Sequence, residues 1–207
     1  MKKEDKKKNT EELTTVLSGK YKDSFDVFKK GEKRNLKDTK SDKNTFIPIE
    51  STEDDIYIVE PEKKLIPDAY KQKKCDYLIF CIKKYQTLFI ELKGENISSK
   101  KDYNPYSQII DTITFLQGEE ELKVLVNAGI EKHAFIVSPG RQKIPKGIDS
   151  KERQLWQKLT QHGASKTKIS DLVHYVKVTK TDRYSNKNNQ IICSPKSPIK
   201  IPFKNQE

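Results

Sequence analysis

Short apolar runs alternate with strongly polar segments along the chain. The runs are "TFIPI" (45–49), "IYIV" (56–59), both halves of "CDYLIFCIKKYQTLFIELKG" (75–94), "HAFIVS" (133–138) and "LVHYVKV" (172–178). Their length and their content of Ile, Val, Phe and Tyr predict strands, and Pro48 favours an edge position for the first. The polar residues midway through 75–94 predict a hairpin.

Two other stretches carry apolar residues at the helical period. Asn104 and Pro105 suit the N-cap and the first turn of a helix over 104–117, whose apolar stripe is Tyr106, Ile109, Ile110, Ile113 and Leu116. A second helix is expected from Ser150, with inward-facing Leu155, Trp156 and Leu159. This order of elements predicts an α/β fold, a mixed β-sheet flanked by helices.

The two ends of the chain differ in composition from its middle. Residues 1–44 hold 14 Lys/Arg and 9 Asp/Glu, which predicts a charged extension with one short amphipathic helix after Thr10 and a linker over 29–44. Residues 45–185 contain the predicted sheet and form the main domain. Residues 186–207 form a basic tail that is too rich in proline for a helix.

The formal net charge of +11 is unevenly distributed along the 207 residues. Residues 140–207 hold 15 Lys/Arg against 5 Asp/Glu, whereas residues 45–66 hold 2 against 6. A positive segment of this kind suits a polyanion such as nucleic acid. A lysine-rich solubilising surface explains the charge equally well, so charge alone leaves both interpretations open.

Several classes of protein are disfavoured by what the sequence lacks. No apolar run resembles a signal peptide or approaches the roughly 18 residues of a membrane span, so we expect a cytoplasmic protein with no membrane partner. The three cysteines are odd in number and form no CxxC pair, which predicts buried thiols: Cys75, Cys81 and Cys193.

The common catalytic motifs built on His and Ser are missing too. The three histidines have no HExxH spacing and are expected to be packing or surface residues: His133, His162 and His174. There is no GxSxG motif, and "GRQKIPKG" (140–147) lacks the order of a phosphate-binding loop.

The predicted hairpin places its charged side chains on one face. Successive residues of a strand point to opposite faces, so Glu91 and Lys93 share a face with Phe89. A turn centred between residues 84 and 85 would set Asp76 opposite Lys93. Opposed residues have Cβ atoms roughly 5 Å apart and diagonal ones roughly 7–8 Å, so Asp76 and Glu91 could hold one metal ion together.

These residues make the chain resemble the PD-(D/E)XK nuclease superfamily. Its members carry Asp on one strand of a core hairpin, (D/E)-x-K on the next strand, and often a Gln on the helix that follows. The corresponding residues are Asp76, Glu91-Leu92-Lys93 and Gln108, and the resemblance covers residues 75 to about 138.

Two features depart from the family pattern. Cys75 stands where the family name has proline. The additional acidic residue that many members carry before the hairpin has three candidates here, Glu50, Asp55 and Glu60.

The resemblance implies a restriction-endonuclease-like core and a Mg²⁺-dependent DNA endonuclease, in which Mn²⁺ can replace Mg²⁺. Asp76 and Glu91 would bind the metal, and Lys93 and Gln108 would complete the catalytic set. The basic residues around this site would contact the DNA backbone, and we expect that surface to contain Lys100, Lys101, Arg141, Lys143 and Lys146.

The biological setting has more than one interpretation. Restriction or another form of anti-phage defence is favoured, with a repair or recombination nuclease as the alternative. A non-catalytic nucleic-acid-binding module, in which the Glu-x-Lys pattern is coincidental or decayed, is the rival from another class. A further alternative is an inert hairpin, in which Asp76 only forms a surface ion pair with Lys93. A homodimer and a larger defence or repair complex are both left open.

Overall fold

A computed structural model describes residues 3–38, 45–68, 73–94, 104–138, 149–160 and 167–205. Its helical elements are α1 (Lys3–Gly19), η1 (Lys22–Ser24), η2 (Pro61–Leu65), α2 (Pro105–Gly118), η5 (Lys123–Leu125), α3 (Asp149–Thr160) and α4 (Ile169–Leu172). Its strands are β1 (Phe25–Phe28), β2 (Lys33–Lys37), β3 (Phe46–Ser51), β4 (Ile56–Val59), β5 (Tyr77–Cys81), β6 (Gln86–Leu92), β7 (Glu131–Val137), β8 (Val173–Val178), β9 (Ser185–Lys187), β10 (Gln190–Cys193) and β11 (Ile199–Ile201).

Eight of these strands form one mixed sheet in the order β1-β4-β5-β6-β7-β8-β10-β9. Pairing from β1 through β4 and β5 to β6 is antiparallel, whereas β6, β7, β8 and β10 pair in parallel. β6 is therefore the strand at which the sheet changes from antiparallel to parallel pairing. The predicted α/β class, a mixed sheet flanked by helices, is confirmed.

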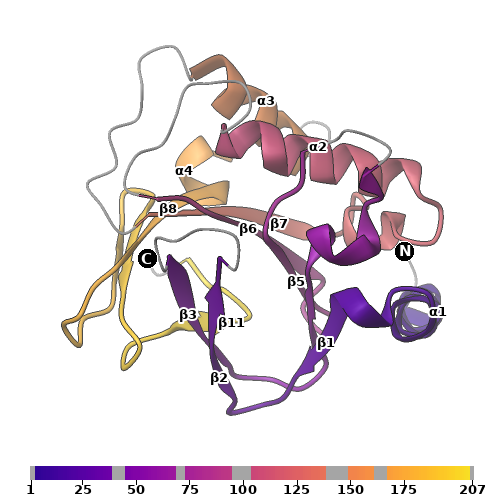
Figure 1. Ribbon diagram of the computed structural model, residues 1–207. Coiled ribbons are helices and arrows are strands. Elements are labelled where there is room, and N and C mark those ends of the chain that lie inside the picture. The colour runs from indigo at the N-terminus through magenta and orange to yellow at the C-terminus, as the bar shows by residue number, and fades with distance from the viewer. Residues whose placement is uncertain are drawn as a thin grey trace.

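The large sheet buries both of its faces. Helices α2, α3 and α4 lie on one face, and the large sheet curves around a three-stranded sheet, β11-β3-β2, on the other (Figure 1). Because side chains alternate along β6, the strand contributes to both cores. Phe89 packs in the core on the helical side, and Leu88 and Ile90 pack in the core on the side of the small sheet. The face assignment predicted for the hairpin is confirmed.

The termini contribute more structure than the sequence predicts. Helix α1 begins at Lys3, ahead of the predicted start after Thr10, and Leu13 and Leu17 join the core on the helical side. The prediction of a linker over 29–44 is wrong for Lys33–Lys37, which form β2. β10 and β11, from the Pro-rich tail, pair with β8 and β3.

The expectation of an edge position for the first predicted strand is wrong. β3 is the central strand of the small sheet, paired with β2 on one side and β11 on the other. Pro48 is tolerated because pairing with β11 begins only at Ile49, so its missing N–H lies beyond the end of β11.

Helix α2 has the N-terminus that its sequence indicates. The side chain of Asn104 accepts hydrogen bonds from the backbone N–H groups of Tyr106 and Ser107, and Pro105 occupies the first turn. Cys75, Cys81 and Cys193 are buried free thiols, as predicted. Among the described helices, none is both long enough and apolar enough to cross a bilayer.

Candidate active site

The charged residues of the hairpin come together where β5 begins and β6 ends. Tyr77 pairs with Ile90 and Leu78 with Phe89, so continuing the register by one pair sets Asp76 opposite Glu91. The predicted pairing of Asp76 with Lys93 is wrong by two residues. A shift of two keeps every side chain on its face, so Asp76, Glu91 and Lys93 still gather on the helical side.

The error in register comes from the turn. Residues 82–85 form a four-residue turn in which the N–H of Tyr85 donates to the carbonyl of Ile82 over 3.2 Å. Tyr85 has a φ of 50°, in the left-handed region, and therefore belongs to the turn. The centre of the turn lies between residues 83 and 84, one position earlier than the sequence indicates.

Glu91 is a fully buried carboxylate with too few partners. Its side chain is 1% exposed, and the ammonium of Lys93 forms an ion pair with Oε1. Beyond this contact with Lys93, neither oxygen of Glu91 accepts a hydrogen bond from the residues that the structure describes. Burial, followed by repulsion from Asp76, raises the pKa of Glu91 well above its usual value.

Asp76 is partly buried and its position is fixed by the backbone of the neighbouring strand. The N–H of Leu92 donates a hydrogen bond of 2.6 Å to Asp76 Oδ2. Burial raises the pKa of Asp76 to about 7, although the Leu92 hydrogen bond and the charge of Lys93 act in the opposite direction. Two neighbouring carboxyl groups therefore both resist losing their protons.

Lys93 lies between Glu91 and helix α2. Its ammonium donates a hydrogen bond to Oε1 of Gln108 and pairs with Glu91, so it does not form the ion pair with Asp76 that the surface-pair hypothesis requires. Nε2 of Gln108 in turn donates to the carbonyl of Lys74 over 3.1 Å. These two contacts fix the orientation of the Gln108 amide, because an ammonium needs an acceptor and a carbonyl needs a donor.

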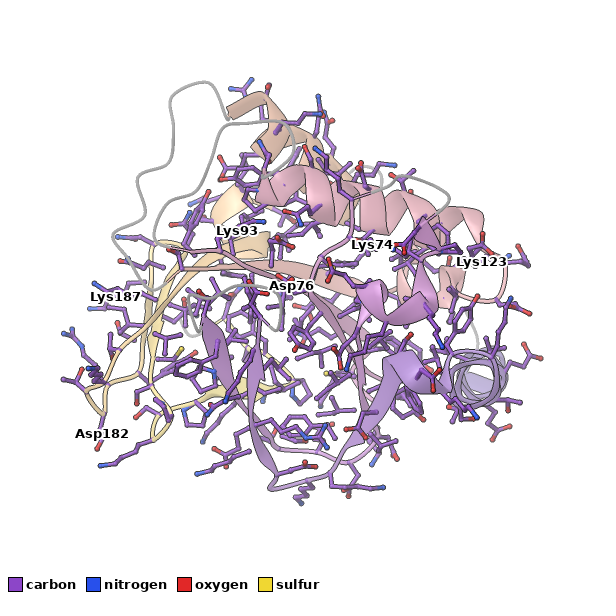
Figure 2. All side chains as sticks on the ribbon, viewed as in Figure 1. Lys74, Asp76, Lys93, Lys123, Asp182 and Lys187 are labelled. Atoms are coloured by element: carbon purple, nitrogen blue, oxygen red, sulfur yellow. The ribbon has the colours of Figure 1, made fainter. Side chains whose placement is uncertain are left out.

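Helix α2 holds both sides of one peptide bond ahead of Asp76. Gln108 binds the carbonyl of Lys74, and Oγ1 of Thr112, one helical turn later, accepts from the N–H of Cys75 over 2.9 Å. The hydroxyl of Thr112 itself donates to the carbonyl of Gln108 over 2.8 Å. The peptide unit that leads into Asp76 is thus positioned by the same helix that holds Lys93. Figure 2 shows Lys74, Asp76 and Lys93 below α2.

The three candidates for the additional acidic residue of the family pattern each form an ion pair with a lysine other than Lys93. Glu50 pairs with Lys33 at 3.8 Å, Asp55 with Lys83 at 3.2 Å, and Glu60 with Lys63 at 2.8 Å.

Two other carboxylates act on the site. The charge of Glu62 raises the pKa of both Asp76 and Glu91, and the charge of Asp38 raises that of Asp76. Neither residue is predicted from the sequence, because Glu62 lies in the short turn η2 and Asp38 follows the polar strand β2, away from any motif. Thr112 is not predicted either, although its spacing of four residues from Gln108 places the two on one face of a helix.

Five basic residues are predicted to contact DNA. All five lie outside the described residues: Lys100, Lys101, Arg141, Lys143 and Lys146.

The donor set of the site suits a hard divalent cation. Within the described ranges, no group of three or more His, Cys, Asp and Glu side chains is arranged to hold a metal ion. Mg²⁺ commonly binds through only one or two carboxylates and keeps several waters. Asp76 and Glu91 fit that pattern, and the buried oxygens of Glu91, whose only partner among the described residues is Lys93, have acceptor capacity that a cation would use.

Two histidines that are distant in sequence meet on the other face of the large sheet. Nδ1 of His133 lies 3.0 Å from Nε2 of His174, and both rings pack edge-on against Phe203. Burial lowers the pKa of His174 to about 3. The expectation of packing histidines is confirmed for this pair, while His162 lies outside the described residues.

Comparison with known proteins adds no relative. No family model matches the chain, and neither the curated proteins nor the solved structures include a match.

Replacing Thr112 by Val should expose the role of its hydroxyl. The variant should lose about 1–3 kcal/mol of unfolding free energy, because the buried N–H of Cys75 loses its acceptor. Urea titration measures the loss, and hydrogen exchange of the Cys75 amide locates it. Thr112→Ser keeps the hydroxyl and should keep that amide protected. Equal protection in the wild type and in Thr112→Val would show that the contact contributes nothing.

The raised pKa of Asp76 predicts a specific pH dependence without divalent ions. Between about pH 4 and pH 7 the folded protein keeps a proton that the unfolded chain releases, so wild-type stability should fall as pH rises. Asp76→Asn retains the acceptor for Leu92 and loses the titration. Its unfolding free energy should therefore rise relative to wild type, by up to about 1.4 kcal/mol per pH unit, and level off above pH 7.

Asp76→Asn has to be compared with the wild type because His174 changes the stability of both proteins with pH, in the direction opposite to Asp76. Its lowered pKa makes the folded protein less stable as pH falls below about 6.5, in both proteins alike. Urea titrations at several pH values measure the difference directly. A difference that does not change with pH would mean that Asp76 titrates normally in the folded protein.

Proposed function

We propose that this protein is a Mg²⁺-dependent nuclease that hydrolyses phosphodiester bonds in DNA. One observation carries the proposal: fully buried Glu91 and partly buried Asp76 lie side by side, and Lys93 is the only donor among the described residues that contacts the oxygens of Glu91. A protein that needed only a stable hairpin would gain by placing apolar residues there. The arrangement suits a cation and an anionic substrate.

Asp76 and Glu91 would hold the metal. When bound, Mg²⁺ supplies positive charge against the phosphoryl group and a coordinated water of lowered pKa. Asp76 needs little reorganisation for this role, because its side chain is already fixed by the N–H of Leu92. A bound metal would stabilise the carboxylate of Glu91 more than that of Asp76, because Glu91 is the more deeply buried.

Lys93 would act on the reacting phosphate. Its side chain is 14% exposed, and its ammonium donates to Gln108 while pairing with Glu91. Once Glu91 has a metal partner, Lys93 is available to orient the attacking water or to stabilise the charge that develops on the phosphoryl oxygens. Gln108 keeps the ammonium directed into the site, since its amide is anchored on the Lys74 carbonyl. Gln108 is thus a positioning residue.

DNA is favoured as substrate by the resemblance of the hairpin to the PD-(D/E)XK superfamily, most of whose members cut DNA. The net charge of +11 is compatible with any nucleic acid. Restriction or another form of anti-phage defence is the proposed setting, with repair or recombination as the alternative. DNA binding without cleavage would instead indicate a non-catalytic nucleic-acid-binding module.

The proposal is tested by incubating the purified protein with plasmid and linear DNA in Mg²⁺ and in EDTA. Cleavage should require Mg²⁺. Lys93→Ala should reduce its rate by roughly 10²–10⁴-fold while DNA binding stays nearly unchanged, because the ammonium acts mainly on the transition state.

The matched control is Lys84→Ala, which removes an exposed lysine from the turn of the same hairpin and should leave cleavage unchanged. DNA binding without cleavage by wild-type protein, with Mg²⁺ present, would overturn the nuclease proposal. Full cleavage by Lys93→Ala would remove Lys93 from the mechanism.

A further inference from the structure

A concave region lies beside the small sheet, formed largely by the C-terminal segment. It is a pocket of about 690 Å³, within the usual size range of ligand sites. Its lining is Glu50, Thr52, Tyr184, Lys196, Ser197, Pro198, Lys200, Pro202, Phe203 and Lys204. Three ammonium groups and one carboxylate thus border a single pocket.

The charges of the pocket are unevenly balanced. Glu50 is already paired with Lys33 at 3.8 Å, and Lys196 with Asp182 at 3.2 Å. Lys200 and Lys204 are exposed, and neither forms an ion pair within the described part of the chain. Glu50, the cross-strand neighbour of Lys200, is the one carboxylate in the lining, so positive charge exceeds negative charge in the pocket and favours an anionic ligand.

The wall that carries these lysines is firmly anchored. The N–H and the hydroxyl of Thr52 both donate to the carbonyl of Ile201, over 2.8 Å and 3.0 Å. The side chain of Gln86 binds both backbone groups of Phe203, accepting from its N–H over 2.7 Å and donating to its carbonyl over 2.8 Å. Lys200 and Lys204 flank this anchored stretch, so binding a ligand needs little ordering of the backbone.

The pocket also offers a surface for a flat apolar group. Tyr184 is half-buried beside the core on the side of the small sheet, and Pro198 and Pro202 are buried in the same lining. An aromatic ring next to ammonium groups is the combination by which proteins bind bases and phosphates together.

We propose that this pocket binds a nucleotide, with phosphates held by Lys200 and Lys204 and the base against Tyr184. The site is separate from the carboxylates. Thr45 immediately precedes β3, and its hydroxyl donates to the carbonyl of Lys93. Glu50 lies five residues further along the extended chain, which corresponds to about 17 Å. The nucleotide is either a free ligand or part of a bound strand, and the inference does not depend on cleavage at Asp76 and Glu91.

Binding is measured in EDTA, so that metal-dependent cleavage cannot interfere. The probes are ATP, inorganic pyrophosphate and a short single-stranded DNA, titrated by calorimetry into the wild type and into Lys200→Gln/Lys204→Gln. The double variant should bind ATP or the oligonucleotide at least about tenfold more weakly, because hydrogen bonds to charged groups are the stronger class. Lys22→Gln/Lys187→Gln has the same net charge, changes exposed lysines outside the pocket, and should bind like wild type.

The three probes distinguish the source of the ligand. Tight ATP binding supports a free nucleotide, and binding of the oligonucleotide alone supports a strand of nucleic acid. Tyr184→Leu should weaken both and leave pyrophosphate binding unchanged. The proposal is overturned if wild type binds neither ATP nor the oligonucleotide, if the pocket variant binds like the control variant, or if Tyr184→Leu has no effect.

Discussion

This site depends on one constraint, the repulsion between two carboxyl groups that have little access to solvent. Asp76 and Glu91 lie opposite each other at the junction of β5 and β6, beneath helix α2, and burial raises the pKa of both. Without a metal, the repulsion between the carboxylates is reduced by protonation and by the ion pair of Glu91 with Lys93. Such strain persists only where the surrounding fold enforces it, and it is typical of functional sites.

Helix α2 supports that arrangement through hydrogen bonds to the segments that follow β6 and precede β5. Gln108 connects Lys93, after β6, to the carbonyl of Lys74, before β5. Thr112 holds the next N–H of the same segment. The helix thus holds residues on either side of the two carboxylates, and its own position is set by its buried apolar stripe. Packing of the core and geometry of the site are thus coupled.

Much of this arrangement could be predicted from local pattern. Alternation along β6 placed Glu91 and Lys93 on one face, and the pattern from Asn104 onward defined α2. The register could not be predicted, because the positive φ of Tyr85 extends the turn and the residue types of the turn do not indicate this conformation. β2 was missed because Leu36 is its only buried side chain. The contacts of Thr112 and Glu62 arise from docking of distant segments, which periodicity cannot reveal.

The central claim is that the two carboxylates form one cation site, and direct titration of Mg²⁺ tests it most simply. Calorimetry at pH 8, where protons compete least, should give one bound ion in wild-type protein and none in Asp76→Asn. Affinity in the wild type should fall at pH 6 as protons reoccupy the site. Equal Mg²⁺ affinity in both proteins, or no binding by wild type at pH 8, would contradict the account.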